Sequence, residues 1–329
     1  MNITIVHYNI IPVTHYGGTE RVIWYLGKEL SLLGHNVTYL VEKGSQCNFA
    51  TIKNIDHSVN IWAQIPENTD VIHFQHQPGD IERAKHPYVV TMHGNANKDA
   101  FIDNNTVFVS KNHAERYSAS TYVYNGLDWD DYLNPTFSKE NYFHFLAKAA
   151  WRIKNVKGAI NVVKKAKNEH LKVLGGDRFN FKMGMRFTLT PKASFYGMVG
   201  GKEKNQLLNK SKGLIFPVLW HEPFGLAIIE SLYYGCPVFA TPYGSLNELI
   251  NKDVGYLSNN RKELTHAIKN IGNYSQKSCN EYAIENFNAK KMALSYIEVY
   301  HKVANGNLLH TQKPKIKNIQ TKKFLDWFE

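Results

Sequence analysis

The stretch LWHEPFGLAIIESLYYGCPV, residues 219–238, joins the signals of a buried helix to two carboxylates. Pro223 suits the first turn of a helix, and Gly225 lets a backbone approach a ligand closely. The apolar run that follows predicts a helix that lasts until the next glycine. Glu222 stands in front of this helix, and Glu230 lies five residues beyond Gly225, roughly 7.5 Å further along a helix axis.

The spacing of the two acids fits a nucleotide-diphosphate sugar, which carries a hexose on one side of its pyrophosphate and a ribose on the other. One carboxylate would accept hydrogen bonds from hexose hydroxyls and the other from the ribose diol, while free amides near Gly225 and Leu226 face the phosphates. A structural explanation stays open, because a glutamate at a helix start is stabilising by itself. Glu230, however, lies in an apolar helix, where a buried glutamate needs a partner.

The rest of the chain alternates short apolar runs with helical patterns, which predicts an α/β protein with parallel, doubly wound sheets. Its 329 residues, 43% of them hydrophobic, supply two cores of ordinary size. The polar stretch over residues 125–140 is typical of a connection between domains. We therefore predict an N-terminal domain over residues 1–133, a C-terminal domain over 134–304 and a tail over 305–329. Parallel sheets bind ligands at the carboxyl ends of their strands, so we expect the site between the two domains.

Composition excludes several classes of protein. The three cysteines, Cys47, Cys236 and Cys279, are too few and too far apart for a disulfide framework or a zinc site. The opening residues have no basic leader with a cleavage site, and no apolar run approaches the roughly 20 residues that span a bilayer. We therefore expect a protein of the reducing cytoplasm.

The net charge of +11 is partly gathered in the tail. HTQKPKIKNIQTKKFLDWFE, residues 310–329, interleaves lysines with aromatic and aliphatic side chains. This pattern is typical of a segment that lies on an anionic membrane surface. The alternative is a solvated tail whose final aromatic residues dock on the protein itself. Charge alone also suggests a nucleic-acid-binding protein, but the sequence holds no recognised module of that kind, and we expect no nucleic-acid partner.

A second candidate element is YGGTER, residues 16–21, between the first strand and the first helix. Gly17 and Gly18 would let amides at the helix start approach an anion. A tight turn needs such glycines too, so the pair alone is weak evidence. The motif is not the G-x-G-x-x-G dinucleotide fingerprint, which disfavours a nicotinamide oxidoreductase.

The strand end VVTMHGN supplies a candidate histidine, His93. His7, His73 and His76 compete for the same role, and a single histidine is more often structural than catalytic. No two of the four have the spacing of metal ligands. We expect no metal site.

The third candidate element is LAKAAWRIKNVKG, in which Lys148, Arg152, Lys154 and Lys157 follow a strand and enter a helix. Cations at this junction would converge with the helix start on a pyrophosphate. The alternative is a solvated basic helix start, but the helix dipole disfavours cations there.

These elements together resemble a known family. WHEPFGLAIIE looks like the E-x7-E element of the retaining GT-B glycosyltransferases, glycosyltransferase family 4, and the likeness runs along almost the whole chain. The pattern YGGTERV…FP.LW.EPFG is closest to the AviGT4-like branch. Further motifs follow in the family's order: DVIHFQH, VVTMHG, FVSKNHAERY, VYNGLDWDDY, VGGKEKNQLL and GCPVFATPYGSLNELI.

The resemblance implies a GT-B fold, in which two Rossmann-like domains face a cleft, the N-terminal one on the acceptor side and the C-terminal one on the donor side. It implies catalytic positions at His93, near the transferred sugar, and at Glu222, on the donor sugar. The other implied donor-binding residues are Glu230 on the ribose, the backbone around Tyr196, Gly197 and Met198 on the base, and Gly17, Gly18, Phe224, Gly225 and Leu226 around the phosphates.

One departure from the family concerns the diphosphate cations. Where the family has an arginine, this chain has Lys148, and an apparent one-residue insertion puts Lys154, or else Arg152, where the family's lysine belongs. Lysine binds phosphate as a point charge, whereas arginine binds it through two parallel hydrogen bonds.

The resemblance implies a retaining, metal-independent transferase without a cofactor. It would move a sugar from a UDP- or GDP-linked donor to a glycan or lipid-linked glycan, in surface polysaccharide or lipopolysaccharide synthesis at the inner face of the cell membrane. No carboxylate nucleophile is evident, so we expect a front-face reaction in which the leaving phosphate takes the acceptor's proton. A sugar-nucleotide epimerase or a phosphorylase of the same fold stays open, as does a basic protein that binds nucleic acid or a membrane surface.

Overall fold

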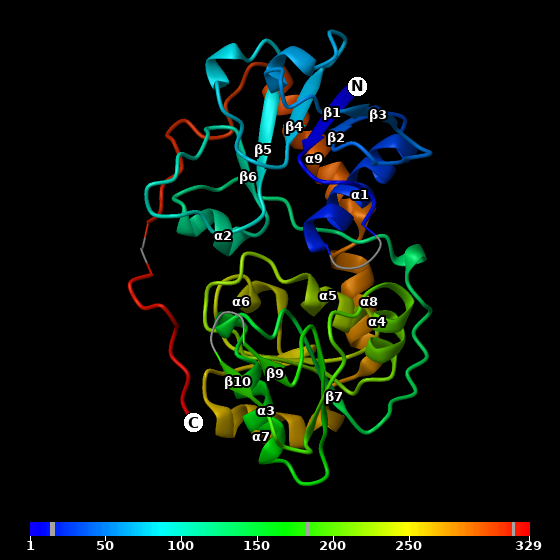
Figure 1. Cartoon of the computed structure of the whole chain (residues 1–329), viewed down its shortest axis with the longest axis vertical. Coiled ribbons are helices and arrows are strands. Elements are labelled where there is room, and N and C mark those ends of the chain that lie inside the picture. Colours follow the sequence, from blue (N-terminus) through cyan, green and yellow to red (C-terminus); the bar gives the residue numbers. More distant parts are fainter. Residues whose placement is uncertain (14–16, 182–184, 318–319) are drawn as a thin grey trace. The chain divides into compact units, whose positions relative to one another are not determined.

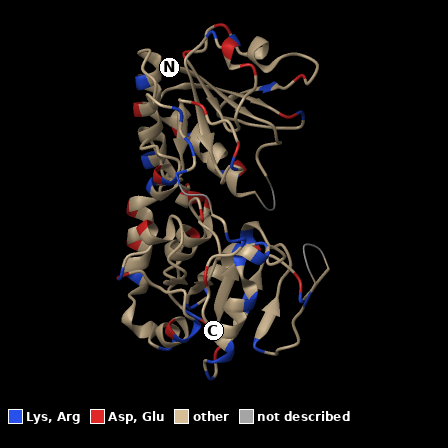
Figure 2. Ribbon diagram, turned by 90° about the vertical axis from the view of Figure 1, so that its left-hand side faces the viewer, with Lys and Arg blue, Asp and Glu red and all other residues tan. Residues whose placement is uncertain are grey.

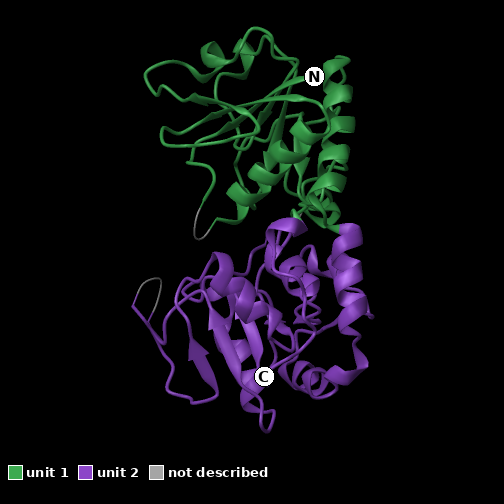
Figure 3. Ribbon diagram, turned by 90° about the vertical axis from the view of Figure 1, so that its right-hand side faces the viewer, with its two compact units in different colours: residues 1–13, 17–128, 287–319 green, residues 14–16, 129–286, 320–329 purple. Residues whose placement is uncertain are grey.

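The computed structural model describes residues 1–13, 17–181, 185–317 and 320–329. Within these residues the chain forms two compact units (Figure 3). Unit 1 holds residues 1–13, 17–128 and 287–317, and unit 2 holds residues 129–286 and 320–329.

Unit 1 is built on a six-stranded parallel sheet in the order β3-β2-β1-β4-β5-β6 (Figure 1). Its strands are β1 Asn2–His7, β2 Asn36–Val41, β3 Thr51–Asn54, β4 Val71–Phe74, β5 Tyr88–Met92 and β6 Thr106–Phe108. Its helices are α1 Gly18–Leu32, α2 Lys111–Arg116 and α9 Ala289–Ala304, with short 3-10 turns at Ile61–Gln64 and Ile81–Arg83.

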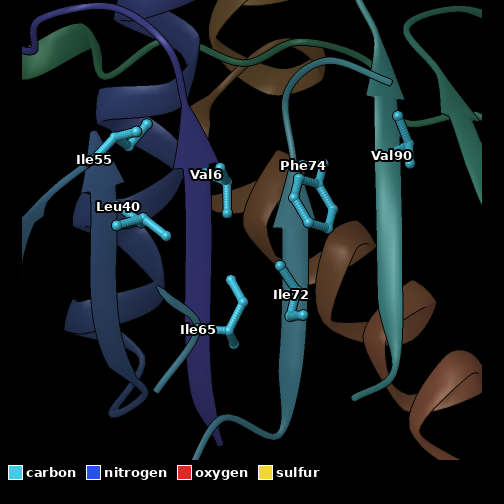
Figure 4. Packing of buried hydrophobic residues seen from close by; sticks show 7 residues of the cluster. All are labelled: Val6, Leu40, Ile55, Ile65, Ile72, Phe74 and Val90. Carbon is cyan, nitrogen blue, oxygen red and sulfur yellow. The ribbon is translucent and has the colours of Figure 1, made fainter. Parts of the chain in front are cut away.

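The core of unit 1 forms because its strands are apolar along nearly their whole length, as parallel strands covered on both faces must be. On one face, fully or nearly buried aliphatic and aromatic side chains pack together (Figure 4): Val6, Leu40, Ile55, Ile65, Ile72, Phe74 and Val90. Helix α9 packs against α1, β4 and β5.

Helix α9 corrects the predicted domain boundary, which assigned residues up to 304 to the second domain. The helix is bound to unit 1 by a buried network: the Tyr300 hydroxyl lies 2.8 Å from Nδ1 of His73, and the Tyr296 hydroxyl lies 2.8 Å from Oγ1 of Thr91. The other ring nitrogen of His73 lies 2.6 Å from the same Thr91 oxygen. His73 therefore has a structural role. Periodicity in the sequence marks a helix with an apolar face, but it does not say which sheet that face covers.

Unit 2 is built on a second six-stranded parallel sheet, in the order β11-β8-β7-β12-β13-β14, and on a separate two-stranded antiparallel hairpin. Its strands are β7 Phe143–Leu146, β8 Leu171–Leu174, β9 Phe179–Asn180, β10 Arg186–Phe187, β11 Ala193–Phe195, β12 Leu214–Phe216, β13 Val238–Ala240 and β14 Gly255–Leu257. Its helices are α3 Val156–Lys164, α4 Gly201–Asn209, α5 Leu226–Tyr233, α6 Leu246–Leu249, α7 Arg261–Lys269 and α8 Gln276–Asn286, with 3-10 turns at Trp129–Asp131, Arg152–Lys154 and Ile271–Asn273. Helices α3 and α7 pack together, as do α5 and α8.

Both sheets confirm the predicted α/β class with parallel, doubly wound sheets. The residues TYVY, 121–124, have the β-branched and aromatic composition typical of a strand, and a strand prediction there is wrong: they contribute an isolated bridge between Phe108 and Tyr122. Strands β3, β11 and β14, each of three or four residues, were not recognised.

The tail divides between the units. In unit 1, the amides of Lys315 and Lys317 donate to the carbonyls of Tyr117 and Arg116, at 2.9 and 2.8 Å. Residues 320–329 pack on unit 2, where the Leu325 amide donates to the Leu219 carbonyl at 2.8 Å. The predicted boundaries treated residues 305–329 as one segment, and the structure splits it. Figure 2 shows that basic positions are spread over both units and are not confined to this tail.

Candidate active site

The loops that leave β7 and β12 meet at the switch point of unit 2. Strand β7 lies between β8, which follows it through α3, and β12, which comes later in the chain. Such a reversal of strand order is where doubly wound sheets bind their ligands. The two loops are bonded to each other: the Leu219 amide donates to the Ile153 carbonyl at 2.7 Å, and the Asn155 side chain donates to the Pro217 carbonyl at 3.0 Å.

Asn155 also shapes the loop that carries Lys154. Its backbone is left-handed, with φ 54°, a conformation that asparagine tolerates better than most residues. Its side-chain oxygen accepts a hydrogen bond from the Gly158 amide at 3.0 Å and so caps α3. The cap fixes where the helix begins and holds the preceding lysine at the switch point.

Glu222 and Lys154 form an ion pair at this point. Lys154 Nζ lies 2.6 Å from Oε2 of Glu222, and both side chains are about nine-tenths buried. The indole nitrogen of Trp220 donates to the same oxygen at 2.7 Å, and Lys154 Nζ lies 4.7 Å from the centre of the Trp220 ring. Glu222 is thus held by two donors on one of its oxygens, and Lys154 brings a positive charge beside it.

The start of helix α5 provides amide donors next to this pair. Gly225, at φ 94° and ψ 70°, turns the chain into the helix, which begins at Leu226. A side chain at Gly225 would be strained, and its Cβ would lie 2.9 Å from the Ile228 side chain. Among the described residues, no side chain caps the helix. The Ile228 amide donates to the Gly225 carbonyl at 2.9 Å, and the amides of Leu226 and Ala227 come too early for an acceptor within the helix. The start of α5 is therefore suited to bind an anion.

The loop after β13 holds the segment in front of α5 in place. The Ser245 amide donates to the Glu222 carbonyl at 2.9 Å, and its hydroxyl donates to the Phe224 carbonyl at 2.7 Å. Gly244 allows this approach, because a Cβ there would lie 2.3 Å from the Glu222 carbonyl oxygen. The backbone, rather than the side chains alone, fixes the geometry of the motif.

Glu230 is buried inside α5 and is bound by two residues from elsewhere in unit 2. Lys204 of α4 forms an ion pair with Oε1 of Glu230, and the Tyr132 hydroxyl donates to the same oxygen at 3.0 Å. The expectation that a buried glutamate needs a partner is met by these two groups.

The other predicted diphosphate cations lie differently. Lys148 is exposed, with Nζ 5.5 Å from the centre of the Trp151 ring. The Arg152 guanidinium lies 5.1 Å from the centre of the Phe324 ring in the tail. Of the three candidates, Lys154 is the one that the structure brings to Glu222.

The segment Tyr196, Gly197 and Met198 follows β11 at the same edge of the sheet. The amides of Gly175 and Gly176 donate to the Gly197 carbonyl at 2.7 and 3.0 Å. Gly197 has φ 65°, and Met198 is exposed. The segment leads directly into α4, which carries the lysine bound to Glu230.

Unit 1 has its own switch point, between β1 and β4. His7 ends β1, Gln75 and His76 follow β4, and His93 follows β5. His93 Nε2 lies 2.8 Å from the side-chain oxygen of Gln75, and burial lowers the pKa of His93 to about 3. His93 is therefore a neutral imidazole at neutral pH.

His7, His76 and Glu20 surround the same strand ends. The His7 and His76 rings stack with centres 5.2 Å apart, and Glu20 Oε1 lies 3.9 Å from Nε2 of His7. The interaction with His7 lowers the pKa of Glu20 below its usual value. Gly17 precedes α1 and Gly18 begins it, and a Cβ at Gly17 would lie 2.7 Å from the Glu20 carboxylate. Tyr16, which opens the YGGTER motif, lies outside the described residues.

Sequence reasoning missed several residues of these two sites. Glu20 stands three residues after Gly17, the N-cap residue of α1, a position that a capping-box pattern marks. Trp220 is two residues from Glu222. Lys204 and Tyr132 lie in two of the motifs that follow the family's order, VGGKEKNQLL and VYNGLDWDDY. No local pattern links them to Glu230, because they are 26 and 98 residues from it and meet it only through the fold.

Within the described part of the chain, no group of three or more His, Cys, Asp or Glu side chains could hold a metal ion. None of the helices in that part has the length and hydropathy of a membrane span.

Residues 133–286 match the family model of the group 1 glycosyl transferases. Almost all of the 129–286 part of unit 2 is thus similar to the group 1 glycosyl transferases. The match ends with α8, and it includes Lys154, Glu222, Lys204 and Glu230. It covers just under half of the chain.

Over more than nine-tenths of its length, the chain has the fold of solved structures that include a glycosyltransferase. AviGT4, a glycosyltransferase involved in avilamycin A biosynthesis, is 17% identical, with a TM-score of 0.74 over 93% of this chain and 98% of that one. HepE from Anabaena, solved in complex with UDP and glucose, is 15% identical, with a TM-score of 0.68 over 92% of this chain and 100% of that one. The predicted GT-B fold is confirmed.

A curated relative is the "uncharacterized 41.2 kDa protein in cps region" of Klebsiella pneumoniae. It is 28% identical over 113 residues, which are 32% of this chain and 31% of that protein. The match thus spans about a third of the relative's length.

Proposed function

We propose that this protein transfers a sugar, with retention of configuration, from a nucleoside-diphosphate sugar to a glycan or lipid-linked glycan. The observation that carries the proposal is the convergence of Lys154, Glu222 and the α5 start at the switch point of a group 1 glycosyltransferase domain. A cation and a helix start suit a diphosphate, and a carboxylate suits sugar hydroxyls.

Each group has a part in the proposed reaction. The bond between the sugar's anomeric carbon and the β-phosphate oxygen breaks, and the acceptor oxygen bonds to that carbon on the same face. The acceptor proton passes to the leaving phosphate oxygen. Lys154 and the α5 amides stabilise the charge that develops on this phosphate, so the proposal requires no metal ion and no cofactor.

We propose that the second glutamate, Glu230, binds the nucleoside part of the donor. Lys204 and Tyr132 hold the Glu230 carboxylate in place, and we propose that this carboxylate accepts hydrogen bonds from the ribose diol. We propose uracil as the base because HepE was solved with UDP, and we propose that the backbone of Tyr196, Gly197 and Met198 meets it.

The acceptor side is proposed for unit 1. Its switch point gathers a neutral His93, His7, His76 and the Glu20 carboxylate, which are groups that hydrogen-bond hydroxyls. We propose a surface polysaccharide or lipopolysaccharide as the product class, which fits the relative in a cps region. This function would place the protein at the cytoplasmic face of the membrane.

Calorimetric titration with UDP, GDP and uridine tests the donor site. We expect UDP to bind the wild type. Lys154→Met should lower the affinity for UDP at least about tenfold, because a hydrogen bond to a charged group contributes about 1.5–3 kcal/mol. Uridine, which has no phosphate, should bind both proteins equally. Lys164→Met, an exposed lysine at the other end of α3, is the matched control and should bind UDP as the wild type does.

Retention is tested separately, from the slow hydrolysis of UDP-glucose in the absence of an acceptor. Proton NMR should show α-glucose first, before it equilibrates. If β-glucose appears first, the retaining mechanism is wrong. If no nucleoside diphosphate binds the wild type, the donor-site proposal fails.

A further inference from the structure

The β9–β10 hairpin of unit 2, whose place in the fold is labelled in Figure 1, exposes several large apolar side chains. It pairs Phe179–Asn180 with Arg186–Phe187 and stands apart from the six-stranded sheet. The exposed fractions of its apolar residues are 46% for Phe179, 70% for Phe181, 75% for Met185, 53% for Phe187 and 81% for Leu189.

The rings of Phe179, Phe181 and Phe187 form a patch, and the exposed Met185 and Leu189 are each two residues from Phe187 in the sequence. The ring centres of Phe179 and Phe187 are 5.8 Å apart, and those of Phe181 and Phe187 are 5.7 Å apart. Isolated apolar residues are normal on a protein surface, whereas a contiguous apolar patch marks a surface that contacts a protein or a membrane.

The same hairpin is basic. Its described residues, 177–181 and 185–192, contain the cations Arg178, Arg186 and Lys192 and one acidic residue, Asp177. The Arg178 guanidinium donates to the carbonyls of Thr188, Thr190 and Ala193, and Arg186 donates to the Asp177 carbonyl and the Thr188 hydroxyl. These acceptors are neutral and orient both guanidinium groups. The Asp177 carboxylate also interacts with Arg186, and the hairpin keeps an excess of cations over this one acid.

We propose that this hairpin binds an anionic lipid bilayer, with its apolar side chains inserted between the headgroups and its cations against the lipid phosphates. Aromatic and aliphatic side chains beside arginine and lysine are the composition of interfacial segments. An anionic bilayer complements the charge of the hairpin and of the chain, which is +11. A second copy of the same basic chain would bring like charges together, which disfavours self-association through this surface.

The inference goes beyond the proposed transfer reaction and does not depend on it. It also differs from the prediction of a membrane contact through the tail, because the tail backbone is hydrogen-bonded to both units. Binding by the hairpin would hold the transferase domain itself at a lipid surface, where lipid-linked acceptors are found.

The test is co-sedimentation of the full chain with vesicles of phosphatidylcholine, with and without phosphatidylglycerol. We expect the wild type to sediment with the phosphatidylglycerol vesicles, less so at high salt, and weakly with phosphatidylcholine alone. The double variant Phe181→Ser, Leu189→Ser should lower the bound fraction at least tenfold. The matched control is Leu32→Ser, Leu308→Ser, which removes two apolar residues of similar exposure, 71% and 59%, in unit 1 and should bind like the wild type.

Three further measurements decide the remaining outcomes. Circular dichroism should show that both double variants are folded. If the hairpin variant sediments with vesicles as the wild type does, the proposal is overturned. It is also overturned if Lys322→Ala, Lys323→Ala in the tail abolishes binding while the hairpin variant does not, or if sedimentation equilibrium shows a wild-type dimer that the hairpin variant converts to a monomer.

Discussion

At the scale of single residues, the ion pair between Glu230 and Lys204 is a feature of unit 2 in which each partner depends on the other. Both side chains are more than nine-tenths buried, so folding removes both charges from water. Such an ion pair adds little to the free energy of unfolding compared with an apolar pair of the same shape. Removing one partner, however, leaves the other charge buried and uncompensated. A site that uses Glu230 for binding must therefore keep Lys204 as well.

We expect Lys204→Met to lower the free energy of unfolding by about 3–5 kcal/mol, and Glu230→Gln to lower it by a similar amount. The double variant should lose clearly less than the sum, because neither charge is then left alone. Urea denaturation of the four proteins measures the coupling. Additive losses would mean that the two groups are not paired.

The sequence alone was informative about Glu222, Glu230 and the glycine at the start of α5, because these lie within one motif and their spacing is fixed by a helix. It did not predict which residues bind these two carboxylates. Lys154 is 68 residues from Glu222, and no local pattern selected it over Arg152 or Lys148. Contacts across a sheet's switch point depend on strand order, which single-sequence patterns do not encode.

At the scale of elements, the position of helix α9 decides how the chain divides between the two units. It completes the core of unit 1 although it follows residues 129–286 of unit 2 in the chain. The sequence predicted a helix here because its apolar residues recur with helical spacing. Its attachment to β4 and β5 rests on Tyr296 and Tyr300, whose hydroxyls bond to groups that looked functional in the sequence.

Tyr300→Phe should lower the free energy of unfolding by about 1–3 kcal/mol, because it leaves a ring nitrogen of buried His73 without its hydrogen-bond partner. Tyr256→Phe removes an exposed hydroxyl from unit 2 and should change stability by less than about 0.5 kcal/mol. Hydrogen exchange should locate the effect of Tyr300→Phe in α9, β4 and β5. Equal loss of protection in both units would contradict the assignment of α9 to unit 1.

At the scale of the whole molecule, buried neutral histidines set the response to pH. Burial lowers the pKa of His73, His113 and His144 to about 3 in the folded protein. In the unfolded chain these groups titrate near pH 6.5. As the pH falls below 6.5 the unfolded chain takes up protons that the folded chain does not, so stability is lost between about pH 6.5 and pH 3.

Each of these histidines should cost about 2 kcal/mol of stability between pH 7 and pH 5, a large amount for a protein of ordinary stability. Urea denaturation at the two pH values, at constant ionic strength, tests this, and hydrogen exchange can follow the two units separately. The expected result is a clearly lower urea midpoint at pH 5 in unit 1, which holds His73 and His113, and in unit 2, which holds His144. Equal midpoints at pH 7 and pH 5 would show that the three imidazoles can be protonated in the folded state.

The place of α9 also sets the order in which the ribosome can finish the two units. Residues 1–128 leave the ribosome without the helix that covers one face of their sheet, and about 160 residues of unit 2 are made before α9 follows. At about 5–20 residues per second the unit 1 sheet waits roughly 10–30 seconds for that cover. The unit that is translated second is therefore the one whose core can close first, and during synthesis the incomplete unit 1 is the part of the chain most in need of a chaperone.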